Sequence, residues 1–283
     1  MTGRPAGPAD LSVTLSNPKA ERVKRVAALA GRSARSRAGV LLVEGPQAVR
    51  EAVRFAADRV HDVYLSPDAA LRYPEIAQEA LAAGLYVHLG TDEVLDAMSA
   101  DAQRVVAVVA STGTSLDDVV AAAPRLVAVL SNVRDPGNAG TVIRVADAAG
   151  ADAVILAGES VDPTNPKVIR STAGSLFHLP IARAPLADVI DALRQAGLLV
   201  LAADGSGEDL LGDASAGSGA GGAEALAAPT AWVFGNEAWG LRPEELALAD
   251  AVVRIPIHGR AESLNLGTAA AVCLYASATA QRA

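Results

Sequence analysis

Three polar clusters in this chain carry residue types that could bind and modify a nucleotide-like substrate. The first holds Asn138 and Arg144, the second Glu237, and the third Ser263 and Asn265. Amide, hydroxyl and carboxylate groups orient a substrate, while a guanidinium binds phosphate or stabilises developing negative charge. The four histidines are scattered and no carboxylate cluster has metal-ligand spacing, so we expect chemistry without a metal ion.

Each cluster follows a short apolar run that is typical of a buried strand. The runs cover residues 126–130, 231–234 and 251–257, and each ends abruptly in glycine or polar residues. Open α/β sheets bind ligands at the carboxyl ends of parallel strands. We therefore expect one polar site built from three loops, with Asn132 at the end of the first strand tying these loops together.

The three clusters resemble the ordered motifs of the SpoU, or TrmH-like, RNA ribose 2′-O-methyltransferases of the SPOUT class. The matching stretches are NVRDPGNAGTVIRVADAAG at 132–150, FGNEAWGL at 234–241 and IPIHGRAESLN at 255–265. The resemblance covers residues 126–283 strongly and 15–112 more loosely. It implies methyl transfer from S-adenosyl-L-methionine to a ribose hydroxyl, an α/β domain with a deep trefoil knot, and a homodimer with its site at the subunit interface.

The resemblance also implies where the cofactor binds. In the family the knotted loops hold it, and the matching positions here lie on three turns. Glycine permits close backbone approach, and isoleucine and leucine side chains can sandwich adenine while backbone groups bind its edge. The expected cofactor residues are Phe234, Gly235, Asn236, Ile255, Ile257 and Leu264.

Arg144 matches an arginine that the family is proposed to use in activating the 2′-hydroxyl. A guanidinium with a pKa above about 12 is a poor base. We therefore expect Arg144 to bind the phosphate beside the target ribose and to stabilise the developing alkoxide. The alternative is a surface ion pair with Asp147 or Asp152.

The other candidate catalytic residues each have a structural alternative. Asn138 could orient the ribose or Arg144, or could cap a helix. Glu237 could hold Arg144 or the ribose, or could be an exposed loop carboxylate. Ser263 is a natural N-cap for a final helix over 263–281, whereas Asn265 would be unusual inside that apolar helix and favours a site role.

The charge distribution predicts where RNA binds. The chain has a net charge of −8, but residues 1–37 contain eight basic and two acidic residues, so this arm carries +6 and the remainder −14. A basic arm can engage phosphates, or it can be only a solvated helix. Arg170 resembles a family position near the RNA. The candidate RNA contacts are Arg22, Arg25, Arg32, Arg35, Arg37, Arg170 and Arg260.

The chain divides into an α/β substrate-binding domain and an α/β catalytic domain. Strands alternate with helices over 38–112, which resembles the L30e-like RNA-binding domain that precedes many SpoU-type catalytic domains. We expect a disordered N-terminus over 1–16, this domain over 17–112, a linker over 113–125 and the SPOUT domain over 126–283. A helix should start at Asn17-Pro18, a loop should follow at 31–37, and 213–229 should be a flexible insertion.

Composition limits the remaining interpretations. Half of the 283 residues are hydrophobic, and neither a secretory signal nor a run long enough to span a membrane is visible, so we expect a cytoplasmic protein. The single cysteine, Cys273, should be a buried core residue. Both tryptophans could stack on bases, although Trp232 alternates into a buried strand.

We predict 2′-O-methylation of ribosomal RNA, most naturally 23S rRNA. Transfer-RNA methylation and a thiostrepton-type resistance methylase are related alternatives. From other classes, a non-catalytic RNA-binding protein would keep the fold without turnover. A nucleotide-dependent oxidoreductase is disfavoured, since Gly205-Ser206-Gly207 is followed by Leu210 where the dinucleotide fingerprint needs glycine.

Overall fold

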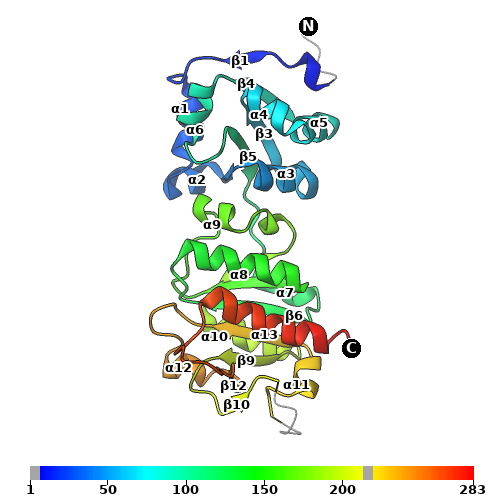
Figure 1. The fold of residues 1–283 in the computed structure, drawn as a ribbon, viewed down its shortest axis with the longest axis vertical. Helices are drawn as coiled ribbons and strands as arrows, with labels where there is room; N and C mark the ends of the chain where they lie inside the picture. The colour runs from blue at the N-terminus through cyan, green and yellow to red at the C-terminus, as the bar shows by residue number, and fades with distance from the viewer. Residues whose placement is uncertain (1–6, 213–218) are drawn as a thin grey trace. The chain divides into compact units, whose positions relative to one another are not determined.

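The computed structural model describes residues 7–212 and 219–283. These residues form two compact units (Figure 1). The first contains the described residues up to Thr112 together with Thr164–His178. The second contains Gly113–Pro163 and Leu179–Ala283. The segment 164–178, predicted to lie in the catalytic domain, is therefore grouped with the first unit.

The first unit is built on a mixed five-stranded sheet. Strand β5 is antiparallel to both of its neighbours, β3 and β2, whereas β1, β4 and β3 run parallel. The order across the sheet is β1-β4-β3-β5-β2. The strands are β1 Val13–Leu15, β2 Val40–Glu44, β3 Val60–Leu65, β4 Tyr86–Gly90 and β5 Val105–Ala110.

Helices pack on both faces of the centre of this sheet, which explains why β2 and β5 are almost continuously apolar. Helices α3 (Pro46–Phe55) and α5 (Pro74–Ala82) share one core with Ile169 and Phe177 of the segment 164–178. Helices α1 (Glu21–Ala28) and α6 (Asp92–Met98) form the other core. The remaining helices of this unit are α2 Arg32–Ala38, α4 Pro67–Arg72 and α9 Pro166–Ser171.

The second unit contains a parallel sheet of seven strands, as the alternation of strands and helices predicts. Its order is β10-β12-β9-β11-β6-β7-β8, so β9 lies between β12 and β11 and β6 lies beyond β11. Because all strands run parallel, their carboxyl ends meet at one edge. The strands are β6 Leu126–Ser131, β7 Ala153–Ala157, β8 Ile181–Ala184, β9 Leu199–Ala203, β10 Asp209–Leu210, β11 Thr230–Phe234 and β12 Ala251–Arg254.

Helices α8 (Pro136–Ala149) and α13 (Leu266–Ala280) lie side by side against this sheet (Figure 1). The Asp135 side chain caps the first helix and Pro136 starts it. The two helices approach closely because Gly267 has no side chain: a Cβ there would lie 2.6 Å from Cγ2 of Thr141. The other helices are α7 Leu116–Ala121, α10 Leu186–Gln195, α11 Ala223–Ala227 and α12 Pro243–Leu246.

Several predicted boundaries were wrong because side-chain hydrogen bonds and tertiary packing overrode local patterns. The first long helix starts at Glu21, since Asn17 instead closes a short turn by accepting from the Lys19 N–H. Residues 31–37 largely belong to α2, and Val13–Leu15 is a strand paired with β4. The predicted linker is folded, because Ser115 and Asp118 form a capping box at α7.

The predicted insertion over 213–229 is only partly irregular. Residues 213–218 lie outside the described residues, but Ala223–Ala227 forms α11, whose Leu226 is buried. Residues 1–6 of the predicted disordered N-terminus also lie outside them. The trefoil knot that the resemblance implies stays a prediction.

Candidate active site

A pocket of about 700 Å³ opens at the carboxyl ends of β9, β11 and β12. This volume suits a nucleoside-sized ligand, since ligand sites commonly enclose about 300–1,000 Å³. All six residues predicted to bind the cofactor line it. The residues that line it include Asn138, Asp204, Phe234, Gly235, Asn236, Glu237, Arg254, Ile255, Ile257, Glu262, Ser263, Leu264 and Asn265.

Gly235 lies where the loop after β11 folds back on itself. The backbones of Asn236 and Gly240 exchange two hydrogen bonds of 2.9 Å, which close the loop. A Cβ at Gly235 would lie 2.3 Å from the Gly240 carbonyl carbon and 2.5 Å from the Leu241 nitrogen. Only glycine fits this approach, so the loop presents backbone groups to the pocket as a cofactor site requires.

Three side chains from three different loops form a continuous hydrogen-bonded chain at this pocket. Asn138 Nδ2 donates to Glu237 Oε1 at 3.3 Å, and Asn265 Nδ2 donates to Asn138 Oδ1 at 3.3 Å. Glu237 also accepts from the Asp135 N–H at 3.1 Å and the Arg134 N–H at 3.4 Å. This series of hydrogen bonds fixes the orientation of both amides. It also joins the three sequence motifs into one site, as predicted.

A buried carboxylate that the sequence analysis did not identify, that of Glu245, holds these loops by hydrogen bonds. Glu245 of α12 is only 8% exposed and accepts from Ser131 Oγ at 2.5 Å and Asn132 Nδ2 at 2.9 Å. The Asn132 carbonyl in turn accepts from Asn236 Nδ2 at 2.7 Å. Asn132 therefore ties the first two motif loops together, which confirms its predicted role. Sequence alone gave no signal that Glu245 would be buried.

The pocket lining carries three carboxylates, Asp204, Glu237 and Glu262, against one guanidinium, Arg254. Asp204, at the end of β9, was not predicted. Its Oδ1 accepts from the N–H and Oγ of Ser206 at 2.9 and 2.7 Å, which leaves Oδ2 beside Gly240. The available signal was its position directly after an apolar run. The excess of carboxylates favours a cationic ligand.

Two residues that could cap helices, Asn138 and Ser263, do not do so. Asn265, not Ser263, caps the final helix by accepting from the Gly267 N–H at 2.9 Å. Asp135, not Asn138, caps α8 and accepts from the Asn138 N–H at 2.7 Å. Asn138 is therefore free to use its side chain in the site, and Asn265 serves both the cap and the site. Ser263 lines the pocket one residue before Leu264.

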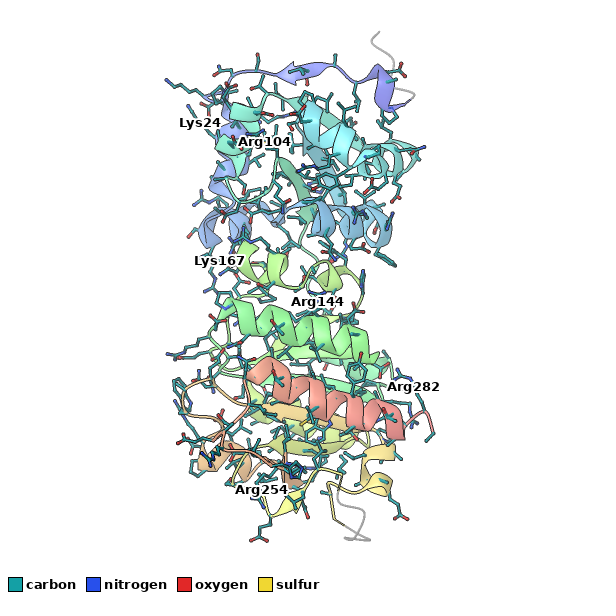
Figure 2. The ribbon with its side chains drawn as sticks, viewed as in Figure 1. Lys24, Arg104, Arg144, Lys167, Arg254 and Arg282 are labelled. Atoms are coloured by element: carbon teal, nitrogen blue, oxygen red, sulfur yellow. The ribbon has the colours of Figure 1, made fainter. Side chains whose placement is uncertain are left out.

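Arg144 does not line the pocket formed by this chain. It lies exposed on α8, where Figure 2 labels it, and six residues separate it from Asn138. That spacing corresponds to about 9 Å along the helix axis and a different helix face. Among the described residues its guanidinium makes no hydrogen bond or ion pair. Asp152, one predicted partner, instead accepts from the N–H groups of Arg125 and Leu126.

Two of the seven candidate RNA arginines are held in place by other groups of the chain. Arg35 is 4% exposed and donates to the carbonyls of Leu29 and Ala30, so burial removes it from a phosphate-binding surface. Arg170 lies within hydrogen-bonding distance of Glu44 and Asp101, at 3.3 and 3.1 Å. Neither arrangement supports the predicted RNA contact. The exposed members are Arg22, Arg25, Arg32, Arg37 and Arg260.

Three further features concern metal binding, membrane spans and the cysteine. Among residues 7–212 and 219–283, no cluster of histidine, cysteine, aspartate or glutamate has a metal-binding arrangement. No helix in the same ranges is long and apolar enough to cross a membrane. Cys273 is fully buried on α13, and burial raises the pKa of its thiol to about 12, so it is a core residue as expected.

The sheet, the glycine-tight loop and the polar chain beside it define an α/β domain with a nucleoside-type cofactor pocket and a small polar reaction site. Comparison with known families agrees with that class. Residues 125–275 match the SpoU rRNA Methylase family, and residues 42–113 match the RNA 2′-O ribose methyltransferase substrate-binding domain. The chain belongs to the SpoU rRNA methylase family.

Relatives cover nearly the whole chain. It is 30% identical over 264 residues to the 23S rRNA (guanosine(2553)-2′-O)-methyltransferase RlmP of Bacillus subtilis, covering 92% of this chain and 97% of that protein. It is 32% identical over 262 residues to the 23S rRNA (uridine(2479)-2′-O)-methyltransferase of Streptomyces viridochromogenes, with 88% and 86% covered.

Solved structures show the same fold. The AdoMet-bound rRNA methyltransferase from Sinorhizobium meliloti superposes with a TM-score of 0.76 at 30% identity, covering 94% of this chain and 97% of that one. The SpoU methyltransferase AviRb from S. viridochromogenes, in complex with AdoMet, gives 0.75 at 30% identity, with 93% and 99% covered. The predicted α/β SPOUT fold and the predicted cofactor are thereby confirmed.

Proposed function

We propose that this protein transfers a methyl group from S-adenosyl-L-methionine to a ribose 2′-hydroxyl of 23S rRNA. The observation that carries the proposal is the pocket at Gly235, Ile255 and Leu264, which lies directly beside the hydrogen-bonded chain of Asn138, Glu237 and Asn265. The named relatives that methylate two different 23S nucleotides support the RNA class and leave the nucleotide open.

The residues present fit the cofactor. The glycine at 235 gives an adenine access to backbone groups, and Ile255, Ile257 and Leu264 supply apolar lining. The carboxylates of Asp204 and Glu262 suit a ligand with ammonium and sulfonium charges. When bound, S-adenosyl-L-methionine supplies a methyl group activated by its positive sulfur.

The polar chain is suited to orienting the ribose. Glu237 is held by two backbone N–H groups, and its carboxylate fixes the Asn138 amide. Side chains whose orientation is already fixed lose little entropy when the substrate binds. Such positioning lowers the activation barrier of the methyl transfer. Arg144 would bind the neighbouring phosphate and stabilise negative charge on the attacking oxygen.

A homodimer would explain how Arg144 takes part in the reaction, because it would lie at the pocket of the partner subunit. Its guanidinium is exposed and unpaired among the described residues, and it does not line the pocket of its own chain. A second copy could bring its Arg144 to this pocket. Mixing an Arg144→Ala chain with a Gly235→Trp chain would then restore one working site per mixed dimer. Light scattering that finds a monomer at micromolar concentration would contradict the dimer.

The test of the function is direct. The purified full-length protein, given labelled S-adenosyl-L-methionine and unmodified 23S rRNA, should label one nucleotide, located by mapping 2′-O-methyl sites. If transfer RNA is labelled and 23S rRNA is not, the substrate is transfer RNA. Cofactor binding without methyl transfer to any cellular RNA would favour a non-catalytic RNA-binding protein. Because ribosomal RNA is the substrate, we place the protein in the cytoplasm.

A further inference from the structure

The loop that carries Glu237 also presents an exposed tryptophan. Trp239 is 44% exposed, whereas the other tryptophan, Trp232, is fully buried and donates from its indole N–H to Ser277 Oγ at 2.9 Å. Trp239 is not among the residues that line the cofactor pocket, although its neighbours Ala238 and Gly240 are. An indole left open to solvent at the rim of a reaction site is therefore available to a ligand other than the cofactor.

Two cations flank this indole. The Arg134 guanidinium lies 5.4 Å from the ring centroid and the Arg242 guanidinium 5.9 Å from it. Both are within the distance at which a guanidinium is attracted to an aromatic face. Arg134 also pairs with Glu159, and Arg242 is exposed. The surface thus combines an aromatic plane with positive charge, the pairing that binds bases and phosphates of single-stranded nucleic acid.

The surrounding backbone holds this platform in place. The Arg134 N–H donates to Glu237 Oε2 at 3.4 Å, and the Arg242 N–H donates to the buried Glu245 at 2.8 Å. The Asn236–Gly240 hydrogen bonds close the loop between them. The indole is consequently positioned by the same network that fixes the site, and a bound base would be placed relative to Glu237 and Asn138.

We propose that Trp239 stacks on an unpaired RNA base next to the target ribose, while Arg134 and Arg242 attract the adjoining phosphates. This inference rests on the proposed function. It adds a requirement for the substrate: a base beside the target ribose must be able to unstack from its neighbours. Stacking tolerates any base, because each has a π-face. The stacking interaction therefore selects unpaired RNA and leaves sequence selection to other groups.

Intrinsic fluorescence gives a direct test, because the chain has only two tryptophans and one is buried. The full chain is titrated with a twelve-nucleotide oligoadenylate and with the same strand paired to oligouridylate. Binding is followed separately by anisotropy of a labelled strand. The single strand should quench the emission and the duplex should quench it much less. Trp239→Tyr should remove the quenching but keep the binding.

Steady-state methylation of 23S rRNA supplies the second measurement. Trp239→Leu, which keeps apolar bulk but no aromatic ring, should raise KM for RNA by roughly 5- to 150-fold, and Trp239→Tyr should restore most of it. Affinity for S-adenosylhomocysteine should be unchanged in both variants. A failure of the wild-type chain to methylate RNA would instead count against the proposed function.

Three outcomes would overturn the inference. One is single-strand binding by anisotropy with no change in the emission of the wild-type chain. Another is wild-type KM and kcat for 23S rRNA in the Trp239→Leu variant. The third is an emission change that follows protein concentration and not RNA, which would place Trp239 at an interface between two copies of the chain.

Discussion

Replacing Gly235 with alanine should remove most cofactor affinity without touching a functional side chain. The new Cβ would lie 2.3 Å from the Gly240 carbonyl carbon and 2.5 Å from its oxygen, and both are backbone atoms that cannot rotate away. An ordinary Cβ contact is 3.4 Å or longer, so the backbone around Gly240 must move away to make room for the new atom. That movement strains or breaks the two Asn236–Gly240 hydrogen bonds.

The magnitude follows from these interactions. Overpacking costs about 1–3 kcal/mol, and each broken backbone hydrogen bond about 0.5–1.5 kcal/mol. If the free energy of cofactor binding becomes about 2.7 kcal/mol less favourable, Kd rises roughly 100-fold. At a ligand concentration of about 100 times the wild-type Kd, bound ligand stabilises the wild type by about 2.7 kcal/mol and the variant by only about 0.4 kcal/mol.

Thermal unfolding with and without S-adenosylhomocysteine measures the difference. The wild-type midpoint should rise by roughly 5–10 °C, and that of Gly235→Ala by about 1 °C. Gly113→Ala is the matched control, since Gly113 is exposed and a Cβ there meets nothing within 4 Å. A wild-type ligand shift in Gly235→Ala would refute the assignment of this loop to the cofactor.

Three further experiments test the reaction site, the cofactor pocket and the basic arm. Arg144→Ala should lower kcat by roughly 10²- to 10³-fold with cofactor affinity intact, and lysine should rescue it only partly; a wild-type rate in Arg144→Ala would refute the assigned role. Asp204→Asn should weaken the binding of S-adenosyl-L-methionine more than that of S-adenosylhomocysteine, the product that lacks the sulfonium charge, as measured by calorimetry. Glu208→Gln, at an exposed residue outside the pocket lining, should change neither affinity. Equal decreases for the two ligands would contradict an electrostatic interaction with the sulfonium. Exchanging Arg25 and Arg37 for glutamine should lower the log–log salt slope of RNA binding by roughly 0.7–0.9 for each phosphate that the protein no longer neutralises, and an unchanged slope would make the arm a solvated surface.

The basic arm is tested by substitution because deleting residues 1–37 would also damage the fold. Val23 and Val26 of α1 are buried in a core shared with Leu95 and Tyr64, and Val13–Leu15 pairs with β4. A truncated chain would lack this packing as well as its charges. The charge distribution identified the arm, but only the packing shows that the arm is part of a domain.

The sequence by itself determined where the three strands that lead into the pocket lie. Apolar runs mark the strands that end at Ser131, Phe234 and Arg254, although the third predicted run extends to 257, beyond the observed end of β12. All six residues that the resemblance assigns to the cofactor line the pocket. These signals are local: a strand's burial and a turn's need for glycine are set by neighbouring residues. Family resemblance added the order of the motifs and the chemistry.

Only the tertiary structure decided which partners these residues have. Asn138 and Asn265 lie 127 positions apart and form one hydrogen bond. The local pattern offered Asn138 and Ser263 as helix caps, whereas Asp135 and Asn265 cap these helices. The burial of Arg35 and Glu245 and the grouping of 164–178 with the first unit also depend on residues distant in the chain. Topology sets such pairings, because a side chain bonds to whatever group the fold brings within reach, and that group leaves no local mark in the sequence.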